Sequence, residues 1–266
     1  MSTPVALTIA GSDSSGGAGI QADLKTFAAL SVYGASVLTA LTAQNTKGVT
    51  GVHLVPPDFV TAQIDAVFDD LAVGAVKIGM VAQAPIADVI SASLARWKPA
   101  HIVLDPVMVA TSGARLLPEE AIAALRSRLI PQATLITPNL PEAAALLDEP
   151  IATSDEAIAA QGRRLLALGC PAVLIKGGHG QGSDSTDYLI SSETSIALAT
   201  PRVATANTHG TGCSLSSAVA AGLAKGESLE AAVRNAKAFI SGAIAAADRF
   251  TVGHGYGPVH HFHRYY

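Results

Sequence analysis

The chain has 266 residues, of which 49% are hydrophobic and 14% are charged, and its formal net charge is −4 at pH 7. A sequence this apolar can bury a sizeable core, which excludes intrinsic disorder. Because it has no excess of positive charge, nucleic acid is not expected as the main partner. Aliphatic residues far outnumber aromatic ones, which favours buried parallel strands and closely packed helices.

The cysteines and the apolar segments indicate a cytoplasmic protein. Cys170 and Cys213 are the two cysteines, and one pair far apart in sequence offers no disulfide framework, which indicates a reducing, intracellular setting. The apolar run at residues 5–10 is too short for a signal peptide. The most apolar helical stretch, residues 231–247, is interrupted by two basic residues, so no membrane span is predicted.

Short runs rich in Val, Ile and Leu predict buried strands, and the segments between them have helical periodicity. The predicted strands are residues 5–10, 36–41, 51–54, 75–78, 101–104, 135–137 and 172–175. Helices are predicted over residues 58–71, from residue 118 through Leu129, and from a capping box at residues 153–156 to Leu168. Gly169 follows that last helix and is expected to end it.

This alternation of strands and helices predicts an α/β fold with right-handed crossovers and a mostly parallel sheet covered on both faces. Residues 188–190 and 194–199 depart from the pattern, and they predict an antiparallel hairpin at the sheet edge. No Pro/Gly-rich linker divides the chain. Residues 1–266 are therefore expected to form one domain.

A glycine-rich turn, residues 11–19 (GSDSSGGAG), follows the first predicted strand and leads into a helix. Ligands of open α/β sheets bind beyond the carboxyl ends of the strands, where this turn lies. Glycine lets the backbone approach a ligand closely and present free N–H groups. The turn matches neither a Walker loop nor a dinucleotide fingerprint, which argues against an oxidoreductase, and a merely flexible turn is the alternative.

Residues 209–213 (HGTGC) precede an apolar helix predicted to run through Ala224. The backbone N–H groups of residues 210–213 would point outwards at the helix N-terminus and form an anion pocket for phosphoryl charge. The same helix end is expected to acidify the Cys213 thiol. Alternatively, Cys213 is a small packing residue, and the glycines only permit a tight turn.

Polar residues follow three other predicted strands: Asp105, then Asn139 and Glu142, and finally Lys176. Two carboxylates can hold hydrated Mg²⁺, while Lys and Asn can contact phosphate oxygens. Each residue alone could be a helix cap or a surface charge. Their shared position at strand ends favours a phosphate and magnesium site.

Taken together, these sites resemble the ribokinase superfamily and, within it, the hydroxymethylpyrimidine (phosphate) kinases of thiamine biosynthesis. The resemblance spans nearly the whole chain. It rests on residues 10–27 (AGSDSSGGAGIQADLKTF), 42–46 (TAQNT), 77–81 (KIGMV), 103–108 (VLDPVM), 137–143 (TPNLPEA), 174–180 (LIKGGHG), 207–214 (NTHGTGCS) and the tail 253–263. It implies a ribokinase-like three-layer α/β sandwich.

The resemblance also implies which residues contact a pyrimidine substrate. They are Gly11, Ala18, Asp23, Gln44, Met80 and Val107. The Gln44 carboxamide offers a donor and an acceptor together, so it can pair with a ring nitrogen and an adjacent amine. Met80 is flexible and polarizable, which suits contact with a flat ring, although ordinary core packing is the reading that the sequence alone favours.

ATP and Mg²⁺ are the implied cofactors. The implied nucleotide contacts are Asp105, Asn139, Glu142, Lys176 and Thr208, with Asp105 and Glu142 holding Mg²⁺ through water. The implied catalytic residues are Lys176, Gly210, Thr211, Gly212 and Cys213. Superfamily relatives generally carry Asp at the position of Cys213, so a Cys213 thiolate acting as base is a hypothesis. Phosphoryl transfer through a loose transition state can dispense with a strong base.

The predicted reaction moves the γ-phosphoryl of ATP to 4-amino-5-hydroxymethyl-2-methylpyrimidine and then to its monophosphate. Pyridoxal kinase and a non-catalytic ligand-binding protein are the alternatives. Gln44 and Cys213 favour the pyrimidine, and an intact Lys176 argues against a pure sensor. The partners are then small molecules, with a homodimer as the family expectation. The histidine-rich tail has no Cys or carboxylate at ligand spacing, so no structural metal is expected there.

Overall fold

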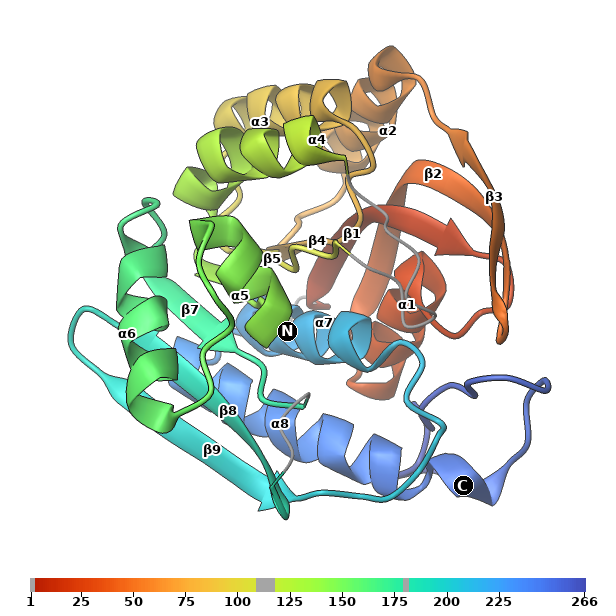
Figure 1. Cartoon of the computed structure of the whole chain (residues 1–266). Helices are drawn as coiled ribbons and strands as arrows, with labels where there is room; N and C mark the ends of the chain where they lie inside the picture. Colours follow the sequence, from red (N-terminus) through yellow and green to blue (C-terminus); the bar gives the residue numbers. More distant parts are fainter. Residues whose placement is uncertain (1–2, 109–117, 179–181) are drawn as a thin grey trace.

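A nine-stranded sheet forms the centre of the computed structural model, which describes residues 3–108, 118–178 and 182–266 (Figure 1). The strands are β1 (Val5–Asp13), β2 (Tyr33–Asn45), β3 (Gly48–Leu54), β4 (Ala75–Ile78), β5 (Ile102–Leu104), β6 (Leu135–Ile136), β7 (Ala172–Ile175), β8 (Asp184–Ser191) and β9 (Ser195–Pro201). Their order in the sheet is β3-β2-β1-β4-β5-β6-β7-β8-β9. The six strands β2, β1, β4, β5, β6 and β7, which are consecutive in the sheet, pair in parallel, so their carboxyl ends meet at one edge.

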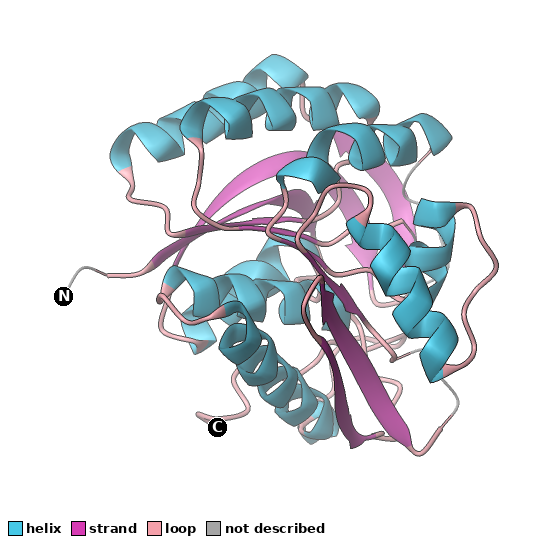
Figure 2. Cartoon of the chain, turned by 90° about the vertical axis from the view of Figure 1, so that its left-hand side faces the viewer, coloured by secondary structure: helices cyan, strands magenta, loops and turns pink. Residues whose placement is uncertain are grey.

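Helices cover both faces of this sheet, above and below it in Figure 2. They are α1 (Gly19–Ala29), α2 (Pro57–Asp70), α3 (Ala84–Trp97), α4 (Glu119–Ala124), α5 (Leu140–Leu147), α6 (Asp155–Leu166), α7 (Thr211–Ala224) and α8 (Leu229–Ala245). Helices α1, α7 and α8 pack on one face, while α2 to α6 pack on the other. The predicted three-layer α/β sandwich is confirmed.

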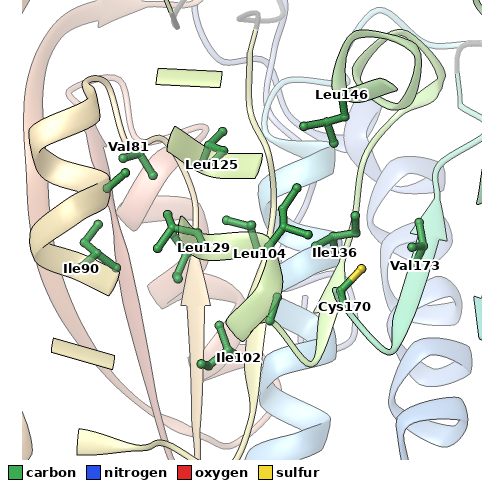
Figure 3. Packing of buried hydrophobic residues seen from close by; sticks show 14 of the residues in the cluster. Val81, Ile90, Ile102, Leu104, Leu125, Leu129, Ile136, Leu146, Cys170 and Val173 are labelled. Atoms are coloured by element: carbon green, nitrogen blue, oxygen red, sulfur yellow. The ribbon is translucent and has the colours of Figure 1, made fainter. Parts of the chain in front are cut away.

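Alternate residues along the short central strands serve the two layers. Val103 packs with α7 and α8, whereas its neighbours Ile102 and Leu104 pack with the opposite helices. Figure 3 shows Ile102 and Leu104 beside Leu129 and Ile136 in that second core. Because both faces are buried, the strand reads as an unbroken apolar run.

The sequence predictions succeed best where local signals are strong. Pro57 opens α2, and β8 and β9 form the predicted antiparallel hairpin. Ser154 caps α6 by accepting from the Ala157 N–H, so the helix begins near the predicted residue but without the capping box predicted at residues 153–156. The prediction of a buried strand at residues 51–54 is wrong, because β3 is a mostly exposed strand antiparallel to β2 at the other edge. The apolar residues of that run alternate with polar ones, as in a half-exposed strand.

The end of the 174–180 motif, His179 and Gly180, lies outside the described residues. Among the residues that the structure describes, no helix has the length and apolar composition needed to cross a membrane.

Candidate active site

The carboxyl ends of the parallel strands open into a cavity of about 920 Å³. Its size is at the upper end of the range for ligand pockets, so it has room for more than one small molecule. With one exception, Asp23, the predicted site residues line it: Gly11, Ala18, Gln44, Met80, Asp105, Val107, Asn139, Glu142, Lys176, Thr208, Gly210, Thr211, Gly212 and Cys213. The fold thus brings together residues from seven separate sequence motifs.

The N-terminus of α7 faces this cavity. Gly210 precedes the helix with φ of 78°, a conformation that favours glycine. A Cβ on Gly210 would also collide with the Gly17 carbonyl oxygen, so the glycine-rich turn touches the start of α7. No side chain of the described residues caps this terminus. The Thr211 N–H donates to the Thr208 carbonyl oxygen at 3.2 Å, so the next N–H groups, those of Gly212 and Cys213, are the ones that the start of α7 leaves for an anion.

Lys176, directly after β7, reaches the same place. Its Nζ lies 2.7 Å from Asp105 Oδ1 and 3.9 Å from Glu142 Oε2. A Cβ on Gly212 would approach that Nζ to 3.2 Å, so the ammonium lies against the first turn of α7. Burial alone lowers the pKa of Lys176, but the carboxylates of Asp105 and Glu142 outweigh burial and raise it. The cavity therefore holds a fixed cation beside a helix N-terminus, which is suited to phosphoryl groups.

Asn139 and Glu142 form the capping box of α5. Asn139 Oδ1 accepts from the Glu142 N–H, and Glu142 Oε2 accepts from the Asn139 N–H, both at 2.8 Å. This local pairing positions Glu142 next to Lys176 and Asp105. Burial, together with the charge of Asp105, raises the pKa of Glu142 to about 6, against the opposing effect of Lys176.

Asp105 has an unused acceptor. Its Oδ1 accepts from Lys176 and from Thr137 Oγ1, whereas its buried Oδ2 has no hydrogen-bond partner within the described part of the chain. A buried unpaired carboxylate oxygen is costly unless a ligand satisfies it. Asp105 Oδ2 and the Glu142 carboxylate together provide oxygen donors of the kind that bind a hydrated Mg²⁺, which keeps several of its own waters.

The Cys213 thiol is not acidified, contrary to the sequence prediction. Burial raises its pKa to about 11, with Asp23 and Asp105 adding to the shift, while Lys77 only partly opposes it. The charge of Lys77 and a hydrogen bond with the Gly19 backbone do not offset the loss of hydration. The thiol is therefore neutral near pH 7, which weakens the hypothesis of a Cys213 thiolate as base.

Asp23 does not reach the cavity wall. It is fully buried, and its two oxygens accept from Lys77 Nζ at 3.0 and 2.9 Å. Thr8 and Ser217 donate their hydroxyls to the same carboxylate. These bonds saturate Asp23 and leave it no access to a substrate, so the structure corrects the expected direct contact to an indirect role.

Another part of the cavity wall contains Gly11, Gln44 and Met80, which are predicted substrate contacts. Met80 is half-buried and packs on Gly11, where a Cβ would collide with its methyl group. Met80 thus lines the cavity instead of filling the core. Gln44 lies on the same wall, with its Oε1 3.0 Å from Thr42 Oγ1 and its Nε2 3.5 Å from His209 Nε2. Asp13 and His209, which the sequence analysis did not select, are joined at 2.8 Å beside them.

A further part of the lining comes from β8, β9 and α8 and was also missed. Val203, Ile240 and Ile244 give it an apolar surface. Beside them, Lys237 Nζ pairs with Asp187 at 2.8 Å and ties α8 to β8. A lysine interrupting an otherwise apolar helix was the signal in the sequence, but its partner could not be read from spacing.

The histidine-rich tail contributes support to this site. His261 Nε2 lies 2.9 Å from Ser214 Oγ in α7, and Pro258 forms a bridge with His209. Burial lowers the pKa of His261 to about 3, so the ring is neutral. In the described residues no group of three His, Cys, Asp or Glu side chains could hold a metal ion.

The solved structures resolve the class of protein. The crystal structure of an ADP complex of Bacillus subtilis pyridoxal kinase superimposes with a TM-score of 0.92 and 37% identity, covering 100% of both chains. The fold is thus ribokinase-like, and the cavity with its lysine and helix N-terminus is that of a small-molecule kinase.

The family follows from sequence comparison. A family model described as phosphomethylpyrimidine kinase matches residues 13–260, and the chain belongs to that family. The hydroxymethylpyrimidine/phosphomethylpyrimidine kinase of Escherichia coli strain K12 is 54% identical over 261 residues, which cover 98% of each protein. The thiamine biosynthesis bifunctional protein ThiED of Geobacter sulfurreducens is 49% identical over 255 residues, covering 96% of this chain and 51% of that protein.

Proposed function

We infer that this chain is a hydroxymethylpyrimidine/phosphomethylpyrimidine kinase of thiamine biosynthesis. It transfers the γ-phosphoryl group of ATP first to the hydroxymethyl group of 4-amino-5-hydroxymethyl-2-methylpyrimidine and then to the resulting monophosphate. The observation that carries this inference is the meeting of Lys176, the α7 N-terminus and Gln44 in one cavity. Relatives with these activities in their names match almost the whole chain.

In this proposal the chain's own residues provide position and charge. Lys176 and the backbone amides of Gly212 and Cys213 hold the phosphoryl oxygens, where charge spreads during transfer. Asp105 and Glu142 would hold Mg²⁺ through water, and the ion would neutralise phosphate charge when bound. Because the Cys213 thiol is neutral, we propose that it packs against the acceptor hydroxyl and is dispensable as a base.

The two ends of the cavity suggest how the substrates lie. We place the adenine against the apolar surface of Val203, Ile240 and Ile244, since a flat base gains from burial there. The pyrimidine lies at the other end, between Met80 and Val107, with Gln44 reading its ring nitrogen and amine. Lys176 then lies between the two, where the phosphates must pass.

Three further proposals complete this function. Residues 1–266 form a single kinase domain, supported by one continuous sheet. The protein is cytoplasmic, supported by two free cysteines. It forms a homodimer, as the resemblance implies, and light scattering would test that state directly.

A coupled ATP-consumption assay with three acceptors tests the function. The pyrimidine alcohol and its monophosphate are expected to support turnover, with pyridoxal at least about tenfold poorer in kcat/KM. Preference for pyridoxal would instead assign the chain a pyridoxal kinase activity like that of its Bacillus subtilis neighbour. Tight binding of the pyrimidine without ATP consumption would identify a non-catalytic binding protein.

A further inference from the structure

A buried pair of side chains joins the glycine-rich turn to the anion pocket. His209 Nε2 lies 2.8 Å from Asp13 Oδ2, although the residues are 196 positions apart in sequence. Asp13 ends β1, and His209 stands just before Gly210 and α7. Both side chains are less than 10% exposed. The imidazole also packs on Gly17, where a Cβ would collide with the ring.

The carboxylate determines where the imidazole proton sits. Besides His209, Asp13 accepts hydrogen bonds from the backbone N–H groups of Ser15, Gly17 and Ala18 and from the Ser15 hydroxyl. Burial alone would raise the pKa of Asp13, but the bonds from His209 and Ser15 outweigh it and lower the pKa to about 2. An ionised carboxylate only accepts, so His209 Nε2 must carry the proton that bonds to it.

That proton constrains the neighbouring Gln44. The single Nε2 proton of His209 is donated to Asp13, so a Gln44 amide nitrogen 3.5 Å from Nε2 would set two N–H donors against each other, whereas the Gln44 amide oxygen would be attracted to that N–H. The far end of the carboxamide gives the same answer. Thr42 Oγ1 lies 2.7 Å from the Ser12 carbonyl oxygen, which takes its single proton, so Thr42 can only accept from Gln44.

Both ends therefore favour the reverse of the placement described above, with Gln44 Oε1 towards His209 and Nε2 towards Thr42. The oxygen and nitrogen of a carboxamide are distinguished by such partners. One lone pair of Oε1 and one proton of Nε2 then remain for a ligand in the cavity.

We propose that Asp13 and His209 are positioning residues that fix the order of donor and acceptor in the Gln44 carboxamide, and thereby select an aminopyrimidine. An exocyclic amine next to an unprotonated ring nitrogen offers a donor and an acceptor. The matching 4-oxo ring offers an acceptor and an N–H donor, which is the reverse order. The inference rests on the proposed function, because it assigns the device that makes Gln44 specific.

Steady-state kinetics of two His209 variants tests the proposal with two acceptors, the aminopyrimidine alcohol and its 4-oxo analogue. His209→Phe keeps a ring against Gly17 but has no donor, so Gln44 can rotate. We expect kcat/KM for the amino compound to fall by about tenfold or more, mainly through KM, while that for the oxo compound is unchanged or rises. His209→Gln keeps an N–H donor and is expected to recover most of the discrimination.

Parallel losses with both acceptors, or an unchanged ratio between them, would overturn the proposal and leave the pair a purely structural role. If His209→Phe does not fold, the double variant Asp13→Asn/His209→Phe removes the unpaired buried charge and provides the same comparison. If the wild-type protein phosphorylates neither pyrimidine, the proposed function itself is wrong. That outcome is distinct from a wild-type enzyme whose selectivity the variants fail to change.

Discussion

Two lysine–aspartate pairs lie near the carboxyl ends of the parallel strands, one with its lysine in β4 and the other with its lysine after β7, and they differ in how completely they are satisfied. Lys77 and Asp23 are both 0% exposed, and every Asp23 oxygen accepts two hydrogen bonds. Lys176 is 12% exposed, and its partner Asp105 keeps one buried oxygen unpaired within the described chain. Both lysines have raised pKa values, because their carboxylate neighbours outweigh the effect of burial.

This contrast separates a structural ion pair from the pair that we propose to serve phosphoryl transfer. Lys77 borders the same cavity, but its pair has no exposed surface and no free acceptor, so it gains nothing from a ligand. A pair with a free acceptor is stabilised when phosphate or a metal ion arrives. The sequence predicted a substrate contact for Asp23 and a nucleotide contact for Asp105. Only the second remains compatible with the geometry.

The largest expected effect is on stability, from Lys77→Met. It leaves the Asp23 carboxylate buried without its cation, which costs about 3 to 5 kcal/mol in the free energy of unfolding. Urea denaturation measures the change, with the exposed Lys225→Met as the matched control. If Asp23 contacted the substrate instead, Lys77→Met would raise KM and would change the free energy of unfolding very little.

Lys176→Met tests the open pair. Removing a cation that stabilises the transferring phosphoryl group is expected to lower kcat by about 10² to 10³. The fold should persist, because the Lys176 side chain lies at the cavity wall and not in the apolar core. Steady-state ATP turnover with the pyrimidine alcohol measures kcat. A loss in kcat below tenfold would contradict a role of Lys176 in stabilising the transferring phosphoryl group.

The pH dependence of Glu142 refines the open site. Burial raises its pKa from 4.5 to about 6, so the folded state binds a proton more tightly than the unfolded state does. The resulting stability is fully present below pH 4.5 and is lost as the pH rises through 6. Magnesium needs the ionised form, so kcat/KM for ATP should fall about tenfold from pH 7 to pH 5. In Glu142→Gln this pH dependence should vanish, and its persistence would assign the titration to another group.

Cys213→Ala should have the smallest effect. The Cys213 thiol is close enough to both pairs for their charges to affect it, and burial keeps it neutral with a pKa of about 11. Turnover is expected to fall less than tenfold, because a loose transition state needs little base catalysis. A loss above a hundredfold, measured under the same conditions as Lys176→Met, would restore the thiolate hypothesis.

The sequence by itself determined the regular elements and the ends of the strands. Pro57, the Ser154 cap and the apolar runs act through neighbours a few residues away, so local spacing suffices to predict α2, α6 and the central strands. Asp105, Glu142 and Lys176 were found because parallel strands bring their carboxyl ends to one edge. The predicted substrate contacts, by contrast, came from the family resemblance.

The tertiary structure alone decided which charges are sealed and which are open. Asp23 meets Lys77 across 54 residues, and Asp13 meets His209 across 196. The exposed β3 edge and the neutral Cys213 thiol likewise depend on what packs nearby. Burial and partner geometry are sums over distant segments, and no local pattern in the chain encodes them.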